Sequence, residues 1–144
     1  MTVIDATERL ERLERVLEDL RSENQHSPIL VEGKRDVEAM RALEVTGEVL
    51  MVNEGKTIIG LCEEIAAKHK EVILLLDWDR KGKELTERFK RNLTAMGVRV
   101  NDSFRARIFS LVAKETKAVE DLDSFVERLR TAVEERRIRP YPGP

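Results

Sequence analysis

The sequence predicts an α/β fold: a Rossmann-like three-layer sandwich with a mainly parallel sheet of four or more strands, preceded by one helix. Short, continuously aliphatic runs at residues 29–32, 49–52 and 72–76 are typical of strands buried on both faces. Longer amphipathic segments with helix start and stop signals lie between them. Such an alternation favours right-handed crossovers and a parallel sheet, with helices on both faces.

Length and composition fit one domain with an aliphatic core. A chain of 144 residues buries roughly 70% of its unfolded surface. Charged residues make up 38% and aromatic residues 4%, so charged helix faces surround an aliphatic interior. We expect an N-terminal helix and connector at residues 1–27, the α/β domain with a last helix at residues 28–138, and a loose Pro-rich tail at residues 139–144.

The first helix is predicted over residues 6–24. Leu10, Leu13, Leu17 and Leu20 recur at alternating spacings of three and four, which gives the helix one apolar face. About two heptads are few for an autonomous coiled coil. The face therefore either docks on its own domain, which we favour, or pairs with the same helix of a second chain in a homodimer.

The first helices of the repeating part have recognisable ends. The helix after the first strand should cover about residues 34–45 and end at Gly47. Thr57 is placed to cap a helix that reaches about residue 69.

The last elements follow the third strand. A long amphipathic helix should run to about Met96 and end at Gly97. Residues 98–100 read as a fourth strand or an extended loop, residues 107–112 as a further strand, and residues 121–137 as a charged final helix.

Cysteine and histidine usage excludes several classes of site. Cys62 is the single cysteine and lies on an apolar helical face, so we expect a buried thiol. With His26 and His69 as the two histidines, a disulfide framework or a Cys/His zinc cluster cannot form. No apolar run reaches membrane-spanning length and no signal peptide is visible, so we expect a soluble, cytoplasmic protein without a membrane partner.

Acidic side chains follow the predicted strands. Glu32 closes the first strand, Asn53 follows the second, and Asp77 and Asp79 follow the third. Because the carboxyl ends of parallel strands share one edge of the sheet, these groups should meet there. Clustered carboxylates repel one another unless a cation lies between them, and oxygen ligands suit Mg²⁺, with Mn²⁺ as the alternative. Mg²⁺ bound in this way usually completes its shell with phosphate oxygens, so we expect a substrate that carries phosphate.

Basic residues and glycines flank the acids. Five cations could hold phosphates, although each could equally be a solvated residue at a helix start. Gly33 and Gly82 stand where the backbone should turn sharply beside the acids, or are plain turn glycines. The five cations are Lys34, Arg35, Arg80, Lys81 and Lys83.

The order of the acids disfavours two other classes of α/β protein. A receiver domain would carry paired acids after its first strand and a single aspartate after its third, the reverse of the order here. A haloacid-dehalogenase phosphatase would place its D-x-D after the first strand of its core. Here Asp77 and Asp79 follow two strand–helix units.

The combined motifs resemble the Toprim domain of topoisomerases, bacterial primases, ribosomal-RNA maturase nucleases and OLD-family nucleases. The resemblance covers about residues 28–112 and is nearest to the small stand-alone Toprim proteins and the maturase branch. It implies that Glu32 is a general acid or base and that Asp77 and Asp79 bind Mg²⁺. Asp36 matches a recurrent acid of the family, or is an acid in the first turn of a helix. The motifs are Glu32-Gly33-Lys34-Arg35-Asp36, Asn53-Glu54-Gly55 and Asp77-Trp78-Asp79-Arg80-Lys81-Gly82.

Departures from the family narrow the expected function. The single tyrosine, Tyr141, lies in the tail, which excludes topoisomerase-like strand passage. The zinc-binding and basic domains of primases and the ATPase of OLD nucleases are missing from this sequence. Glu120 or Asp121 could join the acidic edge, although helix capping or solvent exposure is the preferred interpretation.

We therefore expect a Mg²⁺-dependent phosphotransfer enzyme that acts on nucleic acid, with RNA cleavage ahead of DNA cleavage. A non-catalytic module that binds metal and nucleic acid within a larger complex is the alternative, and primase-like nucleotidyl transfer is a third. Because the net charge is −2, any contact with nucleic acid must be local or mediated by metal.

Overall fold

The computed structural model describes residues 5–52 and 55–138, and its core is a four-stranded parallel sheet. The strand order is β2-β1-β3-β4, and all three pairings are parallel. The α/β fold predicted from strand–helix alternation is confirmed. The strands are β1 (Ile29–Val31), β2 (Val49–Met51), β3 (Glu71–Leu74) and β4 (Arg99–Asn101).

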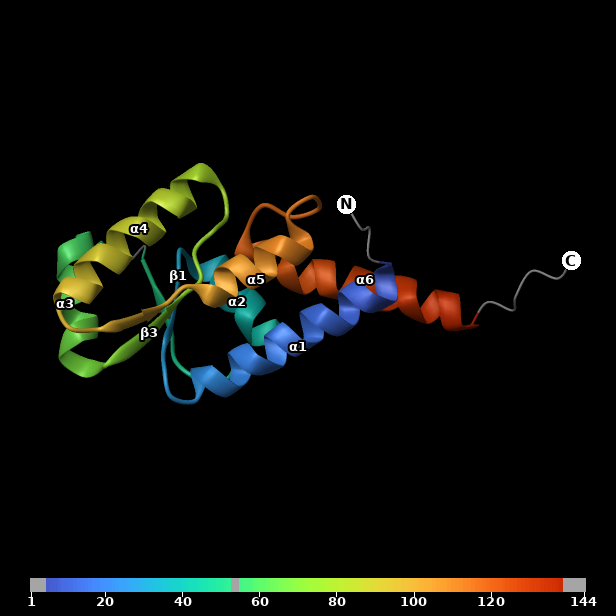
Figure 1. Ribbon diagram of the computed structural model, residues 1–144, viewed down its shortest axis with the longest axis horizontal. Helices are drawn as coiled ribbons and strands as arrows, with labels where there is room; N and C mark the ends of the chain where they lie inside the picture. The colour runs from blue at the N-terminus through green and yellow to red at the C-terminus, as the bar shows by residue number, and fades with distance from the viewer. Residues whose placement is uncertain (1–4, 53–54, 139–144) are drawn as a thin grey trace, which may run out of the picture.

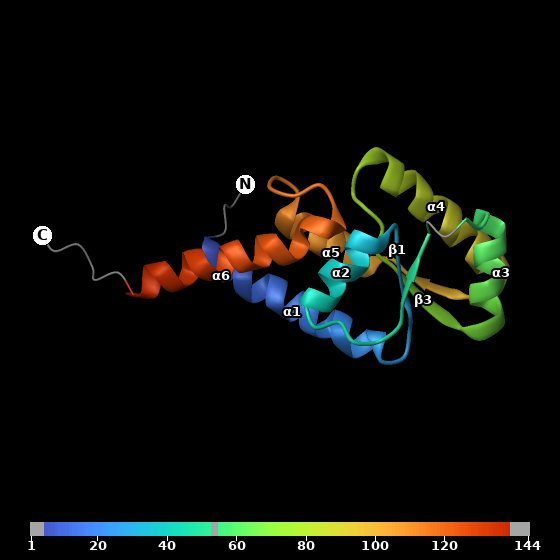
Figure 2. The ribbon, with the colours of Figure 1, turned by 180° about the vertical axis from the view of Figure 1, so that it is seen from behind.

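Helices cover both faces of the sheet. One face carries α3 and α4, and the opposite face carries α1, α2, α5 and α6 (Figure 1, Figure 2). Each face has its own apolar cluster, so the sheet is the middle layer of three. The helices are α1 (Ala6–Asn24), α2 (Lys34–Ala42), α3 (Ile58–Lys68), α4 (Arg80–Ala95), α5 (Ser103–Val112) and α6 (Leu122–Ile138), and a 3₁₀ turn, η1 (Val119–Asp121), precedes α6.

Helix α1 spans the predicted residues and packs on the chain itself. Leu13, Leu17 and Leu20 are at most 1% exposed and lie in the same apolar cluster as side chains of α5 and α6. The apolar face that pairing with a second chain would require is therefore already covered. Helices α1 and α6 lie side by side and extend away from the sheet (Figure 1, Figure 2).

Residues 107–112 are helical, so the prediction of a strand there was wrong. They belong to α5, in which Phe104, Ile108 and Val112 are buried at a spacing of four. The side chain of Asn101 accepts hydrogen bonds from the backbone N–H and the hydroxyl of Ser103, which starts the helix directly after β4. The high β propensity of the aliphatic and aromatic residues concealed this spacing.

Several predicted helix ends are confirmed and one is wrong. Thr57 accepts a hydrogen bond from the Gly60 N–H and caps α3, and Gly97 ends α4 with a φ of 85°. Helix α2 ends earlier than predicted, because Glu44 rather than Gly47 takes the left-handed conformation, with a φ of 63°.

Cys62 is buried as expected, and burial raises the pKa of its thiol to about 11.

Candidate metal centre

The candidate site lies where the chain changes direction across the sheet. From β1 the chain moves outward to β2, whereas β3, which pairs with the other side of β1, leads outward to β4. A crevice forms outside the carboxyl ends of two such strands, and it is the usual ligand site of open parallel sheets. Glu32 follows β1 and Asp77 follows β3, so both lie at this point.

The Glu32 and Asp77 side chains contact each other. Oε2 of Glu32 accepts the backbone N–H of Asp77 at 2.9 Å, which brings the two carboxyl groups close together. Oδ1 of Asp77 also accepts the backbone N–H of Val119 at 2.8 Å. Burial, together with the negative charges of Glu32 and Asp79, raises the pKa of Asp77 to about 7.

Asp79 is exposed and caps α4. Its Oδ1 accepts the backbone N–H of Gly82 at 2.7 Å. Gly82 therefore lies in the first turn of a helix and not in a turn between elements. A Cβ at this position would stand 1.8 Å from the carbonyl oxygen of Asp77, so the loop that carries both aspartates requires glycine here.

Asp36 is a fourth acid next to the pair. Its Oδ2 accepts the backbone N–H of Gly33 at 3.0 Å, and its own backbone N–H donates to the Gly33 carbonyl oxygen at 3.2 Å, which fixes the start of α2. The residue is 6% exposed, and burial raises its pKa, with further contributions from the charges of Asp77 and Glu120. Glu120 in η1 is thus close enough to act on this group, and both Glu120 and Asp121 are exposed.

Arg105 is a contributor that the sequence did not indicate. Its guanidinium donates to the carbonyl oxygen of Leu76 at 3.1 Å and to that of Asp77 at 2.8 and 3.2 Å. These bonds fix the backbone that leads into the acidic pair. Bonds to carbonyl groups leave no motif, and Arg105 lies just ahead of a segment that was predicted as a strand, so no sequence signal pointed to it.

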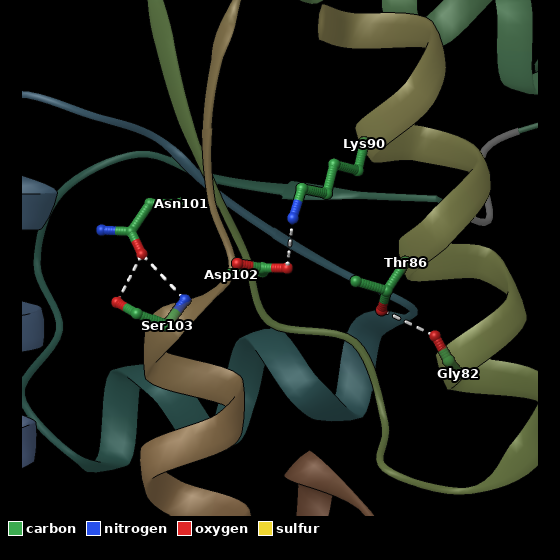
Figure 3. A network of polar contacts seen from close by, with 6 residues as sticks. All are labelled: Gly82, Thr86, Lys90, Asn101, Asp102 and Ser103. Atoms are coloured by element: carbon green, nitrogen blue, oxygen red, sulfur yellow. Dashed lines mark hydrogen bonds and ion pairs between the residues drawn. The ribbon is translucent and has the colours of Figure 1, made fainter.

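Polar residues after β4 are used to join elements. Asp102 forms an ion pair with Lys90 of α4 at 3.2 Å, and Asn101 holds Ser103, as Figure 3 shows. In α4, the Thr86 hydroxyl donates to the carbonyl oxygen of Gly82 at 2.7 Å (Figure 3). Of these contacts, the ion pair of Lys90 joins the helix that Asp79 caps to the start of α5.

The predicted phosphate-binding residues surround the acids from two helix starts. Lys34 and Arg35 begin α2, and Arg80, Lys81 and Lys83 lie in the first turn of α4. All five are exposed. Arg80 pairs with Glu84 at 3.3 Å, and the other four make no ion pair within residues 5–52 and 55–138.

The turn after β2 and a hollow beside this strand lie next to the candidate site. Asn53 lies outside the described residues, and Gly55 has a φ of 75° and is exposed. A hollow of about 460 Å³ lies beside β2, between α2 and α3. Lys34 lines it, but Glu32, Asp77 and Asp79 do not, so the acidic edge formed by these three residues is separate from this hollow.

The acids fit a divalent cation by their chemistry. As the side chains stand, no group of three or more Asp, Glu, His or Cys residues in the described part of the chain is arranged to hold a metal ion. Glu32 and Asp77 lie together, while Asp79 is turned toward Gly82. The donors are carboxylate oxygens, the kind that Mg²⁺ takes. Burial is the main cause of the raised pKa of Asp77, and the charges of Glu32 and Asp79 add to it; a bound cation would offset both effects.

Comparison with known proteins identifies the family. The model of the Toprim domain matches residues 27–111, more than half of the chain. The chain belongs to the Toprim family. The predicted resemblance is thereby confirmed. Relatives of this chain include small archaeal proteins.

The similarity covers most of each relative. UPF0292 protein MJ1624 of Methanocaldococcus jannaschii is 35% identical over 84% of this chain and 94% of its own length. UPF0292 protein TV1259 of Thermoplasma volcanium is 37% identical over 75% of this chain and 89% of its own. A solved structure of an Aquifex aeolicus protein superposes with a TM-score of 0.65 and 25% identity, covering 75% of this chain and 95% of that one.

Membership in the Toprim family implies a function that depends on a divalent metal and involves nucleic acid. The described part of the Toprim chain contains no helix that is both long and apolar enough to cross a membrane.

Proposed function

We propose that the protein is a Mg²⁺-dependent nuclease that acts on RNA. The observation that carries the proposal is the contact between Glu32 and Asp77 at the switch point of the sheet, with Asp79 two residues away. Asp77 and Asp79 would hold the ion, and Glu32 would act as general base or as an additional ligand. A bound Mg²⁺ would supply stabilisation of the charge that develops on the phosphoryl oxygens.

The acidic and basic side chains of the site would have different roles in hydrolysis. Oε2 of Glu32 is hydrogen-bonded to the Asp77 N–H, so its other oxygen would take a proton from the attacking water. The water oxygen then bonds to phosphorus while the bond to the leaving oxygen breaks, and the leaving oxygen takes up a proton from solvent. Lys34, Arg80 and Lys83 would position the flanking phosphates by charge. Asp36 would support Gly33 and the start of α2 behind the acids.

Incubating pure protein with structured RNA and with DNA, in Mg²⁺ or Mn²⁺, tests this assignment. We expect Mg²⁺-dependent cleavage of RNA that is lost in Glu32→Gln and retained in Glu63→Gln, an exposed glutamate of α3. Trace activity that stays the same in Glu32→Gln would point to a contaminant and reject the nuclease.

A non-catalytic module that binds metal and nucleic acid is the second candidate. Two observations favour it: the net charge of −2, and the engagement of Asp79 in a helix cap rather than beside Asp77. Metal-dependent binding of RNA without turnover would support it. Incorporation of labelled nucleotides on a single-stranded template would instead indicate primase-like transfer.

A further inference from the structure

An aromatic surface adjoins the acidic edge. Phe109 of α5 is 42% exposed, and among the described residues it is one of three large apolar side chains with such exposure, the others being Ile59 and Met96. Its ring lies against the half-buried indole of Trp78, with centroids 6.4 Å apart and planes tilted by 48°. Trp78 is the residue between Asp77 and Asp79, so this surface begins at the proposed metal ligands.

The indole is held in place by the same loop that holds Asp77. Nε1 of Trp78 donates to the carbonyl oxygen of Thr116 at 2.9 Å, and three residues later the Val119 N–H binds the Asp77 carboxylate. The segment from Thr116 to Val119 thus contacts both the aromatic surface and Asp77. A ring that is fixed before binding loses little freedom when a ligand stacks on it.

Two exposed lysines lie in the loop that carries Thr116. Lys114 and Lys117 lie in this loop, two residues before and one residue after Thr116. Both are exposed and make no ion pair within residues 5–52 and 55–138. Glu115 lies between them in sequence but is paired with Arg9 at 2.9 Å. An aromatic face next to unpaired lysines suits a ligand that has a flat ring and phosphates.

We propose that Trp78 and Phe109 form a stacking site for an unpaired nucleobase and that Lys114 and Lys117 contact the phosphates beside it. The inference rests on the proposed function and deepens it: the substrate is single-stranded next to the phosphate that is cut. The base must be unpaired because both faces of a base inside a duplex are covered by its neighbours. One exposed phenylalanine is too little for a stable protein interface, which buries at least about 1,000 Å².

Trp78 is the single tryptophan of the chain, so its fluorescence reports on this site. The full-length protein in Mg²⁺ is titrated with a nuclease-resistant 2′-O-methyl RNA of twelve nucleotides that cannot pair with itself, and with the same strand in a duplex. Strand integrity is checked on a gel. We expect saturable quenching by the single strand and binding of the duplex that is weaker by roughly tenfold or more.

Variants separate stacking from simple apolar contact. Phe109→Ala and Phe109→Leu should each weaken single-strand binding roughly tenfold, while Phe109→Tyr keeps it. Ile59→Ala, which removes an exposed apolar side chain of α3, is the matched control and should bind like wild type. Because Phe109 is exposed, its variants should fold, which unfolding midpoints verify.

Equal binding of duplex and single strand, or wild-type affinity in Phe109→Leu, would overturn the stacking site. So would a wild-type dimer that Phe109→Ala converts to a monomer in sedimentation, since the surface would then join two copies. The expected binding pattern without cleavage of ordinary RNA would reject the nuclease and leave the stacking site standing. Cleavage that depends on Glu32, with unchanged binding in Phe109→Leu, would support the nuclease and reject the stacking site.

Discussion

At the scale of single residues, Asp77 is the most constrained group of the site. Its N–H binds Glu32 after β1, its carboxylate binds the N–H of Val119 in η1, and its carbonyl oxygen receives the guanidinium of Arg105 from α5. Contacts from three separate parts of the chain therefore fix one acid. Such support is what a metal ligand needs if it is to hold its position.

The raised pKa of Asp77 predicts how the stability of the metal-free protein depends on pH. The folded-state pKa of about 7 lies above the ordinary value of 3.8, so the protonated form is favoured by folding. This contribution is fully present below about pH 4 and is lost as pH rises through 7. In EDTA, the urea midpoint should therefore fall between pH 5 and pH 8, and Asp77→Asn should reduce the fall.

Mg²⁺ should counteract this loss more at pH 8 than at pH 5, because it binds the ionised carboxylate. Asp19→Asn, which alters an exposed acid of α1, serves as control and should keep the wild-type fall. If the urea midpoint in EDTA fell as much between pH 5 and pH 8 in Asp77→Asn as in wild type, the assignment of the raised pKa to this group would be contradicted.

Gly82 offers a second prediction at this scale. Because a Cβ there would meet the Asp77 carbonyl oxygen at 1.8 Å, Gly82→Ala must displace backbone that Arg105 also binds. We expect a loss of about 1–3 kcal/mol in the free energy of unfolding and weaker Mg²⁺ binding by calorimetry. Glu87→Ala on the exposed face of α4 should change neither, and a fully stable Gly82→Ala would show that the loop adapts easily.

Sequence reasoning reached some residues of the site and not others, for physical reasons. Glu32 and Asp77 could be placed together because each ends an aliphatic run, and parallel strands bring such ends to one edge. Arg105 could not be found, since it acts on carbonyl groups that every residue possesses. The orientation of Asp79 was also hidden, because D-x-D is compatible with both a metal ligand and a helix cap.

At the scale of elements, α1 and α5 show when a periodic pattern is sufficient. In α1 the apolar residues form one clear stripe among charged ones, so both its ends and its buried face were predictable. In α5 the buried residues Phe104, Ile108 and Val112 are mixed with the apolar Phe109 and Leu111. The helical period is thereby obscured, and only packing against α1 and β3 decides the conformation.

Helix α1 is predicted to be an integral part of the fold rather than a separate appendage. Leu17 is 1% exposed in the main apolar cluster, so Leu17→Ala should lower the free energy of unfolding by about 2–5 kcal/mol. Glu18→Ala, at the neighbouring exposed position, should stay within about 0.5 kcal/mol of wild type. Urea unfolding measures both. A cost below about 1 kcal/mol for Leu17→Ala would mean that residues 1–27 form an independent unit, as the sequence boundary at residue 27 allows.

At the scale of the whole molecule, topology and charge act together. The strand order brings the ends of β1 and β3 together at the acidic edge, and two helix starts beside it carry five exposed cations on a chain whose net charge is −2. Attraction for nucleic acid must then come from a local group of cations and not from the overall field. This combination determines how binding should respond to salt.

Because few phosphates are contacted, the dependence of RNA affinity on salt should be shallow. If Lys34, Arg35, Arg80, Lys81 and Lys83 each neutralise one phosphate of a single strand, they contribute a slope of about −3.5 to log K against log salt concentration. Lys83→Ala should make the slope less steep by about 0.7, whereas Lys70→Ala, a change at an exposed lysine before β3, should leave it unchanged. Fluorescence anisotropy of a labelled strand at several KCl concentrations gives these slopes. An unchanged slope in Lys83→Ala would remove Lys83 from the binding surface.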